Sequence, residues 1–454
     1  TYYLSVRATD VAGNMSSVST ADGITIDLTA PSGTTVSDGT GGDITYSSSD
    51  SILSANWAAF TETVSGIQKY EYAIGDTIGG TNVVTWTDND TSTSVIKSGL
   101  TLTSGSIYYI NVRAIDNAGN IANVITSDGA MVDTAAPISG SVTDSTAADL
   151  DWTKSSSTLT ATWMGFSDTL SGIQKYEYAI GDTIGGTGVL SWTDNSMTTS
   201  ITKTGLALSN GTTYYVSVRA TDNVGNISTI VTSDGIAVDT DSPVLETPFE
   251  GSLTADMDHQ NSATTLIISW SGSDTASGIA MYEYTLEFFF SGLQMSLVPW
   301  TSAETATSDT LTGLNLVEGS TYYLSVRATD VAGNISSVSS ADGITIDLTD
   351  PVAGSAIDGT NTDISYTSSD STLTVSWSAF SDPLTGLYNT HSDIASYQAT
   401  VEDGSGNTVL DWTDVGNVNT WTATGLSLSN ATTYLVLIRA ADAAGNLSAN
   451  VSTD

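Results

Sequence analysis

The sequence contains no cysteine and few basic residues: its 454 residues include 10 Lys and Arg against 50 Asp and Glu. Without disulfides, folded domains must be held by core packing or by bound ions. The net charge of −40 would repel phosphate backbones and anionic membrane surfaces, which argues against nucleic-acid binding. No apolar run reaches the ~18 residues that a membrane-spanning helix needs, so direct membrane insertion is not expected.

Catalytic motifs are also missing. The sequence has no H-E-x-x-H, no G-x-S-x-G and no phosphate-binding loop. With no Cys and only His259 and His391, neither a nucleophilic triad nor a zinc site is expected, and both histidines are interpreted as ordinary side chains. A glycosidase-type carboxylate pair would occur once, whereas most acidic residues here recur at equivalent positions, as in a scaffold. We therefore expect no enzyme.

Internal repetition dominates the sequence. The phrase Tyr-Tyr-x-x-Val-Arg-Ala-x-Asp-x-x-Gly-Asn recurs at spacings of 106, 106 and 108 residues, and a looser copy follows after 112. Its arginines are Arg7, Arg113, Arg219, Arg327 and Arg439. An Asp-x-x-x-Pro marker, which ends at Pro31, Pro137, Pro243 and Pro351, follows the same period. Such periodicity is typical of tandem arrays.

The markers predict domain boundaries. Repeats are expected at 29–134, 135–240, 241–348 and 349–454, and residues 1–28 are expected to be the last two strands of a preceding repeat. Residues 65–81 and 171–187 are identical, and residues 1–29 match 321–349 at all but two positions. This close similarity indicates recent duplication within a longer parent chain.

One repeat shows the expected secondary structure. Residues 157–163 alternate between apolar and polar and end at Trp163, and turn residues recur about every ten positions. Further strands are predicted at 173–180, 189–192, 200–206, 213–220 and 227–238. About seven strands in about a hundred residues favour a sandwich of two antiparallel sheets.

Three features carry a resemblance to a known family. They are the lone Trp at 57, 163, 270 and 377, the segment 206–214 with its corner-like Tyr214, and the Val-Arg-Ala-x-Asp-x-x-Gly-Asn phrase. Together they resemble fibronectin type III domains of bacterial surface proteins. The resemblance implies an all-β fold of tandem seven-stranded antiparallel β-sandwiches, arranged as beads on a string. It leaves function open, because such modules serve as spacers, adhesive tips and enzyme appendages.

In this fold the B–C and F–G loops gather at the end where the linker enters. Each junction is therefore expected to bring together a linker Asp, a B–C loop acid and an F–G loop Asp with its Asn. The candidate ligands are Asp27, Glu62, Asp116 and Asn120; Asp133, Asp168, Asp222 and Asn226; Asp239, Asp274, Asp330 and Asn334; and Asp347, Asp382, Asp442 and Asn446.

Two interpretations of these residues stay open. Asp-x-x-Gly-Asn is a good turn, because Asp caps the backbone and Gly supplies a positive φ. Alternatively, the carboxylates hold Ca²⁺, which takes six to eight oxygen ligands, and the ion stiffens the junction.

Two recurring side chains suggest surface roles. Arg113 and its equivalents lie mid-strand, where each is expected to pair with an acid or to lie over an aromatic ring. Trp86, Trp192, Trp300 and Trp412 could stack on sugars, but a Trp repeated in every unit more often fills a core.

Two segments depart from the repeat. Phe288, Phe289 and Phe290 replace a Gly/Thr loop in the third repeat. Since alternate strand residues point to opposite sides, at least one Phe should be exposed, either as a partner contact or beside a locally enlarged core. The fourth repeat extends its B–C loop over 387–393, which includes His391.

These observations predict a structural or adhesive repeat region of a large bacterial protein, extracellular or on the cell surface. It would act as a stalk, adhesin or filament subunit, with neighbouring repeats and copies of itself as partners. The rival hypotheses are a glycan-binding module and an accessory region of a secreted hydrolase.

Overall fold

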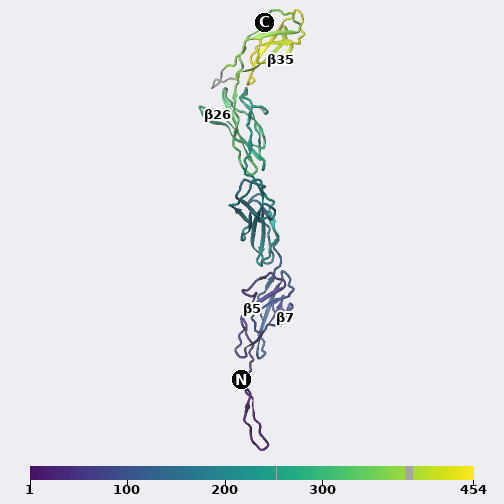
Figure 1. Cartoon of the computed structure of the whole chain (residues 1–454), viewed down its shortest axis with the longest axis vertical. Coiled ribbons are helices and arrows are strands. Elements are labelled where there is room, and N and C mark those ends of the chain that lie inside the picture. Colours follow the sequence, from purple (N-terminus) through teal and green to yellow (C-terminus); the bar gives the residue numbers. More distant parts are fainter. Residues whose placement is uncertain (252, 384–391) are drawn as a thin grey trace. The chain divides into compact units, whose positions relative to one another are not determined.

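The computed structural model describes residues 1–251, 253–383 and 392–454, and all regular structure in these ranges is β (Figure 1). The prediction for His391 and most of the extended loop 387–393 fall outside the described residues. Within the described ranges, no helix has the length and apolar character needed to span a membrane.

The first sandwich shows the pattern of the whole chain. One sheet has the order β3 (Val36–Asp38), β5 (Ile52–Trp57), β8 (Ser94–Ser98). The other has the order β7 (Val84–Asp88), β6 (Ile67–Gly75), β9 (Ile107–Asp116), β11 (Ala130–Val132), β4 (Tyr46–Ser47), and β10 (Ile125–Thr126) also pairs with β9. We call β3, β5, β6, β7, β8 and β9 strands A, B, C, C′, E and F, and β10 with β11 forms strand G.

The same strand order recurs in the second and third sandwiches. In sandwich 2 the sheets are β12 (Ser141–Thr143), β14 (Leu159–Met164), β17 (Ser200–Lys203), and β16 (Leu190–Asp194), β15 (Ile173–Gly181), β18 (Thr213–Asp222), β20 (Ile236–Val238), β13 (Trp152–Thr153), with β19 (Val231–Thr232) on β18. In sandwich 3 they are β22 (Phe249–Glu250), β24 (Thr265–Ser269), β28 (Ser308–Thr312), and β27 (Leu293–Glu304), β26 (Ile279–Phe290), β29 (Thr321–Asp330), β31 (Ile344–Ile346), β23 (His259–Gln260), with β30 (Ser339–Ser340) on β29. A short pair, β21 (Val244–Leu245) and β25 (Gly272–Ser273), completes it.

Sandwich 4 and the first residues complete the chain. Sandwich 4 has the sheets β32 (Ala356–Asp358), β33 (Thr372–Trp377), β36 (Thr420–Thr424), and β35 (Thr408–Gly416), β34 (Ile394–Asp403), β37 (Tyr434–Asp442), β38 (Val451–Ser452). Near the start of the chain, β1 (Ser5–Val6) pairs with β2 (Ser19–Thr20) in an antiparallel hairpin; its assignment to a preceding repeat stays a prediction. The predicted all-β sandwich class is confirmed.

Each core lies between two sheets and is built around one tryptophan. Trp57 on strand B is buried among Leu53, Tyr70 and Val112, which come from both sheets. Its ring meets Tyr70 edge-on, with centroids 5.8 Å apart. The equivalent Trp163, Trp270 and Trp377 are buried as well. Burial of such large rings supplies much of the apolar area that stabilises a disulfide-free domain of this size.

A tyrosine corner closes each sandwich, as predicted from residues 206–214. The Oη atom of Tyr214 accepts a hydrogen bond of 2.9 Å from the backbone N–H of Ser209. Tyr108, Tyr322 and Tyr434 make the same contact five residues upstream. The corner fixes the turn that leads into strand F.

One predicted strand is wrong in its extent. The sequence suggested a continuous strand over 227–238, but the structure has β19 and β20 separated by Ser233, Asp234 and Gly235. Gly235 has φ +106°, which L side chains rarely adopt, so the strand breaks there. The backbone N–H of Gly235 turns instead toward the carboxylate of Asp144.

Candidate metal centre

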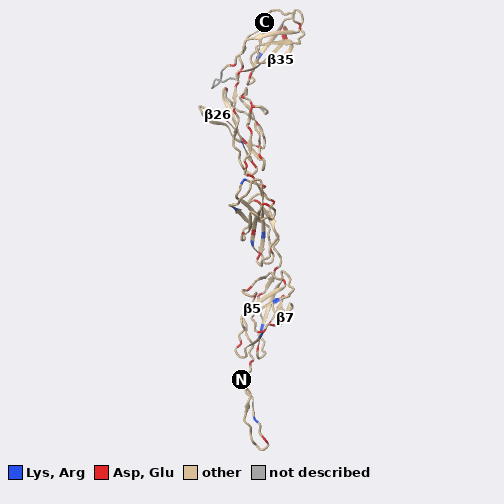
Figure 2. Cartoon of the chain, in the orientation of Figure 1, with Lys and Arg blue, Asp and Glu red and all other residues tan. Residues whose placement is uncertain are grey.

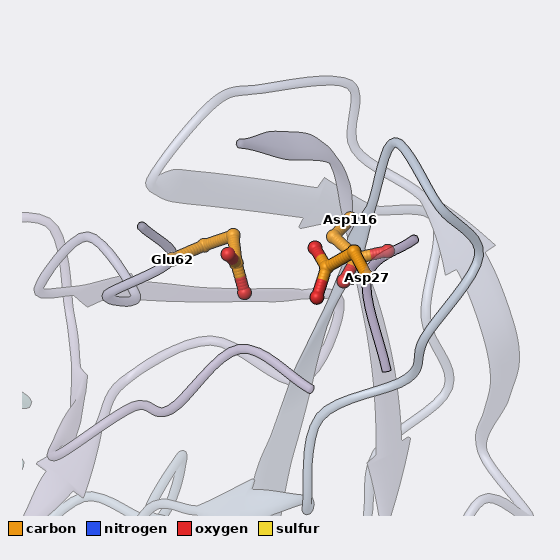
Figure 3. A group of neighbouring side chains, drawn as sticks. All are labelled: Asp27, Glu62 and Asp116. Atoms are coloured by element: carbon orange, nitrogen blue, oxygen red, sulfur yellow. The ribbon is translucent and has the colours of Figure 1, made fainter. Parts of the chain in front are cut away.

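Three carboxylates meet where the linker enters a sandwich. One oxygen each from Asp27, Glu62 and Asp116 lies within 4.8 Å of the others, and Figure 3 shows the three side chains facing one another. The same spacing holds for the groups Asp133, Asp168, Asp222 and Asp239, Asp274, Asp330. We call these groups the linker triads. In these three junctions the structure thus brings together the acids that the sequence predicted to meet.

The F–G loop positions the innermost carboxylate. Asp116, the last residue of β9, is fully buried. Its Oδ1 atom accepts hydrogen bonds from the backbone N–H groups of Ala118 and Asn120, and its Oδ2 atom accepts one from Asn120 Nδ2. Burial alone would raise the pKa of Asp116, but these hydrogen bonds outweigh it and hold the pKa below the ordinary value. The carboxylate is therefore kept as an anion.

The F–G asparagine ties the linker to the loop. Asn120 Nδ2 donates to the main-chain oxygen of Asp27 at 3.2 Å. Asn226, Asn334 and Asn446 make the same contact to Asp133, Asp239 and Asp347, at 3.1, 2.8 and 2.9 Å. The asparagine amide thus acts as a donor in all four junctions. The sequence suggested this asparagine as a candidate metal ligand. In the structure its amide group holds the linker main chain in place.

The B–C loop completes the centre. Asp168 Oδ1 accepts from the backbone N–H groups of Leu170 and Gly172, and Asp133 Oδ2 accepts from that of Ser171. Asp274 and Asp239 repeat this arrangement. In the fourth junction, Asp347 and Asp382 both accept from the backbone N–H of Ser392.

The first junction differs because Glu62 replaces the shorter Asp. Glu62 Oε1 accepts from the backbone N–H of Val64. Asp27 Oδ1 accepts from Thr29, but its Oδ2 atom is buried without a hydrogen-bond partner among the described residues. A buried carboxylate oxygen with no donor is costly unless a cation or a water molecule meets it.

The hydrogen bonds of Asp116 and its equivalents are those of a capped turn. The turn interpretation therefore accounts for the F–G loop by itself. The close approach of three acids, two of them buried at Asp133 and Asp222, is not explained by turn geometry. Oxygen ligands of this kind suit a hard divalent cation.

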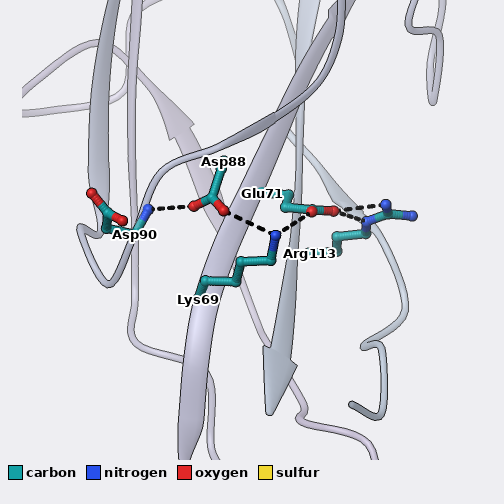
Figure 4. Close-up of polar contacts among 5 residues, drawn as sticks. All are labelled: Lys69, Glu71, Asp88, Asp90 and Arg113. Carbon is teal, nitrogen blue, oxygen red and sulfur yellow. Dashed lines mark hydrogen bonds and ion pairs between the residues drawn. The ribbon is translucent and has the colours of Figure 1, made fainter. Parts of the chain in front are cut away.

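A second recurring arrangement lies on the sheet that contains strand C. Arg113 pairs with Glu71 at 2.7 Å, and Lys69 bridges Glu71 and Asp88 at 2.9 Å each (Figure 4). The guanidinium carbon of Arg113 stands 4.1 Å from the Trp86 ring centroid. The predicted roles of the arginine, pairing with an acid and lying over a ring, are both present.

The expectation that the second Trp of each repeat fills a core is wrong. Trp86 and Trp192 are only half-buried and lie outside the core, and Trp300 is 37% exposed. Arg219, Arg327 and Arg439 cover one face of Trp192, Trp300 and Trp412 at 4.2 to 4.5 Å. The covered face is unavailable to a sugar ring.

Strand order decides the kind of repeat. In each sandwich strands A, B and E form one sheet, while C′, C, F and G lie in the other. The tyrosine corner precedes strand F in all four. The repeats are fibronectin type III-like β-sandwiches.

Solved structures with several such domains are similar to the chain. They include chicken CNTN1 FN1-FN3 domains (17% identity, 70% of this chain and 98% of that one, TM-score 0.27). A tetra-tandem repeat in the extending region of a large adhesion protein (20%, 92% and 98%, 0.27) and the fibronectin(III)-like modules of Clostridium thermocellum CbhA (17%, 45% and 94%, 0.26) also match. Because these TM-scores are low, the fold assignment rests on the strand order within each sandwich.

Relatives in sequence cover only part of the chain. Exoglucanase B of Cellulomonas fimi is 31% identical over 303 residues, which are 61% of this chain and 24% of that protein. Chitinase A1 of Niallia circulans is 27% identical over 169 residues, which are 35% of this chain and 22% of that protein. The chain thus spans about a quarter of the length of these relatives. No protein-family model matches it.

The three phenylalanines occupy the end of a long hairpin in the third fibronectin type III-like repeat. Phe288 packs against the core beside Tyr322, whereas Phe289 and Phe290 are 48% and 54% exposed. Leu293 and Met295 on the facing strand are exposed too. The structure thus places one Phe inward and leaves an apolar hairpin end.

Sequence reasoning missed one recurring acidic group. It comprises Asp38, Asp43 and Asp128 in sandwich 1 and Glu250, Asp256 and Asp342 in sandwich 3. The available signal was the Asp-Gly pair that follows Ser or Ala at 127–129, 233–235 and 341–343. In the second repeat this pair fell inside the continuous strand predicted over 227–238.

Proposed function

We propose that the chain is a non-catalytic spacer region of a larger extracellular protein, in which each linker is fastened to the sandwich that follows it. The observation that carries this proposal is the contact from the F–G asparagine amide to the linker main chain, which recurs at all four junctions. A contact repeated this faithfully serves the array rather than one site. Figure 2 shows acidic residues along every repeat and few basic ones, and such an excess of one charge favours solubility.

The sequence relatives support an accessory region of a polysaccharide-degrading enzyme. Exoglucanase B and chitinase A1 are named for enzymes that act on polymers. Such polymers are degraded outside the cell, and a spacer would set the distance between a catalytic domain and its substrate. The chain would contribute reach, with each repeat contacting chiefly its neighbours.

Calcium at the linker triads would reinforce the fastening. In the triad Asp27, Glu62 and Asp116, one oxygen of each acid lies within 4.8 Å of the others, and the buried Asp27 Oδ2 has no donor in the part of the chain that the structure describes. A divalent cation there would link the linker, the B–C loop and the F–G loop through their oxygens. The proposed function does not require the ion, because the asparagine contact fastens the linker independently.

Small-angle X-ray scattering of the full chain tests the spacer. The wild-type chain is compared with a variant carrying Asn120→Ala, Asn226→Ala, Asn334→Ala and Asn446→Ala, and with a control carrying Asn82→Ala and Asn195→Ala in other loops. We expect the junction variant to show a broader distribution of interatomic distances than the wild type. The control should show the wild-type distribution. A wild-type chain that is compact, or junctions that tolerate the four changes, would contradict the proposal.

The exposed hairpin end favours a second candidate, lateral contact between copies of the chain. Phe289, Phe290, Leu293 and Met295 form its apolar surface. Replacing Phe289 with Ser should lower the apparent mass in light scattering at high concentration. The conservative Phe289→Tyr serves as the control, and an unchanged mass for Phe289→Ser would count against assembly through this surface.

A further inference from the structure

The acidic group missed by sequence reasoning lies beside the loop between strands A and B. In sandwiches 1 and 3 one oxygen from each of its three acids lies within 4.8 Å of the others. We call these groups the A–B triads. In sandwich 2 the equivalent Asp144 has Asp149 and Asp234 as charged neighbours. None of these residues belongs to a linker triad.

One member of each A–B triad is buried at the end of strand A. Asp38 is 2% exposed, and Asp144 and Glu250 are 0% exposed. One oxygen of each buried acid accepts a hydrogen bond of 2.9 Å from a backbone N–H. The donors are Gly129 for Asp38, Gly235 for Asp144 and Leu324 for Glu250. The other oxygens, Asp144 Oδ1 and Glu250 Oε2, are buried without a hydrogen-bond partner among the described residues.

The remaining two acids approach this buried carboxyl from exposed loops. Asp43, Asp149 and Asp256 in the A–B loops each accept the backbone N–H of the buried acid. Asp128, Asp234 and Asp342 lie in the break that divides strand G. The group therefore brings together acidic side chains from strand A, the A–B loop and the break in strand G.

Electrostatics disfavour this arrangement without a positive partner. Burial, together with the smaller effect of the nearby Asp256 and Asp342, raises the pKa of Glu250 to about 8. Burial likewise raises the pKa of Asp38 and of Asp144 to about 6. A proton would neutralise the buried carboxyl, but it would leave the other two carboxylates facing each other.

We propose that the A–B triad of sandwich 3, where the acids converge and Glu250 Oε2 is buried without a partner among the described residues, binds a divalent cation, and that Ca²⁺ is the ion its ligands suit. Three carboxylates offer up to six oxygens, and Ca²⁺ accepts carboxylates in mono- or bidentate mode with water completing the shell. Mg²⁺ would retain several waters and demands a stricter octahedron. The ion would clamp strand A to the two halves of strand G.

Counting bound calcium tests the proposal. The full chain is dialysed against radioactive Ca²⁺ at pH 7.4 and 0.15 M salt, as wild type and as Glu250→Gln, Asp342→Asn and Asp182→Asn variants. Gln has the shape of a protonated Glu, and Asp342 is exposed, so both variants are expected to fold. Asp182 lies in an exposed loop outside both kinds of triad and controls for the loss of one charge.

The expected result is one bound ion fewer in both Glu250→Gln and Asp342→Asn, and an unchanged count in Asp182→Asn. If either triad variant keeps the wild-type count, the proposal is wrong, and for Glu250→Gln the buried carboxyl then carries a proton instead. The linker triads are intact in these variants, and the scattering experiment uses other residues. Failure here therefore leaves the spacer proposal standing.

Discussion

A difference between sandwiches allows a sharp test of how the buried acid is held. In sandwiches 1 and 2 the backbone N–H groups of Ile110 and Val216 donate to the hydroxyls of Ser127 and Ser233, at 2.9 and 3.0 Å. In sandwich 3 Ala341 stands at the serine position. The equivalent N–H, that of Leu324, donates to Glu250 Oε1 at 2.9 Å instead. Glu250 therefore stands at the position of the buried Asp and accepts the N–H that a serine hydroxyl accepts in sandwiches 1 and 2.

Shortening this acid should break the contact. Glu250→Asp would withdraw the acceptor by one methylene and leave the buried N–H of Leu324 unsatisfied. Leaving such a group unpaired costs about 1–3 kcal/mol. Ala341→Ser alone adds a hydroxyl to a site that Glu250 already fills, and overpacking costs about 1–3 kcal/mol. The double variant recreates the arrangement of sandwiches 1 and 2 and should recover most of the stability.

Amide hydrogen exchange measures this loss of stability in sandwich 3 separately from the other sandwiches. In chelator, amides of β29 should exchange about five to 150 times faster in Glu250→Asp than in wild type, as 1–3 kcal/mol implies. They should return close to the wild-type rate in the double variant. The amides of β18 in sandwich 2 provide an internal control that should not change. Costs that simply add in the double variant would refute the idea that Glu250 replaces a serine hydroxyl.

Other perturbations have expected outcomes of their own. In chelator, the midpoint of unfolding of sandwich 3 should fall as pH rises from about 5 to 8. The folded-state pKa of Glu250, about 8, exceeds its unfolded value, so stability is full below the unfolded pKa and is lost through the folded one. Glu250→Gln should flatten this profile in urea titrations, and an unchanged slope would assign the effect to other groups. Asp116 has a lowered pKa, so its contribution should be present at neutral pH and lost in acid; Asp116→Asn should reduce the acid sensitivity of sandwich 1 in the same assay. Tyr214→Phe removes the corner hydroxyl and should cost sandwich 2 about 0.5–1.5 kcal/mol by calorimetry, the usual net worth of one hydrogen bond; no loss would show that the corner does not stabilise the fold. Arg113→Lys should weaken the contact with Trp86 by about 0.5–1 kcal/mol, which a double-mutant cycle with Trp86→Leu measures.

Much of the fold followed from local patterns. The alternation that ends at Trp163 placed that ring in the core, and the segment 206–214 predicted the corner of Tyr214. Both are short-range signals that strand geometry turns directly into burial or a turn contact. The linker triads could also be anticipated, since a known sandwich topology gathers the B–C and F–G loops at one end.

The errors arose where the answer depends on a neighbouring strand. Trp163 and Trp192 both lie in alternating segments. Trp163 faces the opposite sheet and is buried, whereas Trp192 lies on the outside, where Arg219 covers one face of its ring. The sequence around Ser233–Gly235 predicts a continuous strand. In the structure the strand breaks there, because the Gly235 N–H donates to Asp144, a residue far away in sequence. Sequence spacing alone does not reveal which partner a backbone group finds.

By itself the sequence determined the repeat, the two-sheet architecture and the excess of negative charge, because these depend on periodicity and composition. Tertiary structure alone decided that one oxygen each from Asp38, Asp43 and Asp128 converge within 4.8 Å, and that Glu250 accepts the N–H that a serine accepts in sandwiches 1 and 2. These residues come from strand A, a loop and a broken strand G. Their meeting is fixed by the packing of strands that are distant in sequence, and no local pattern carries that information.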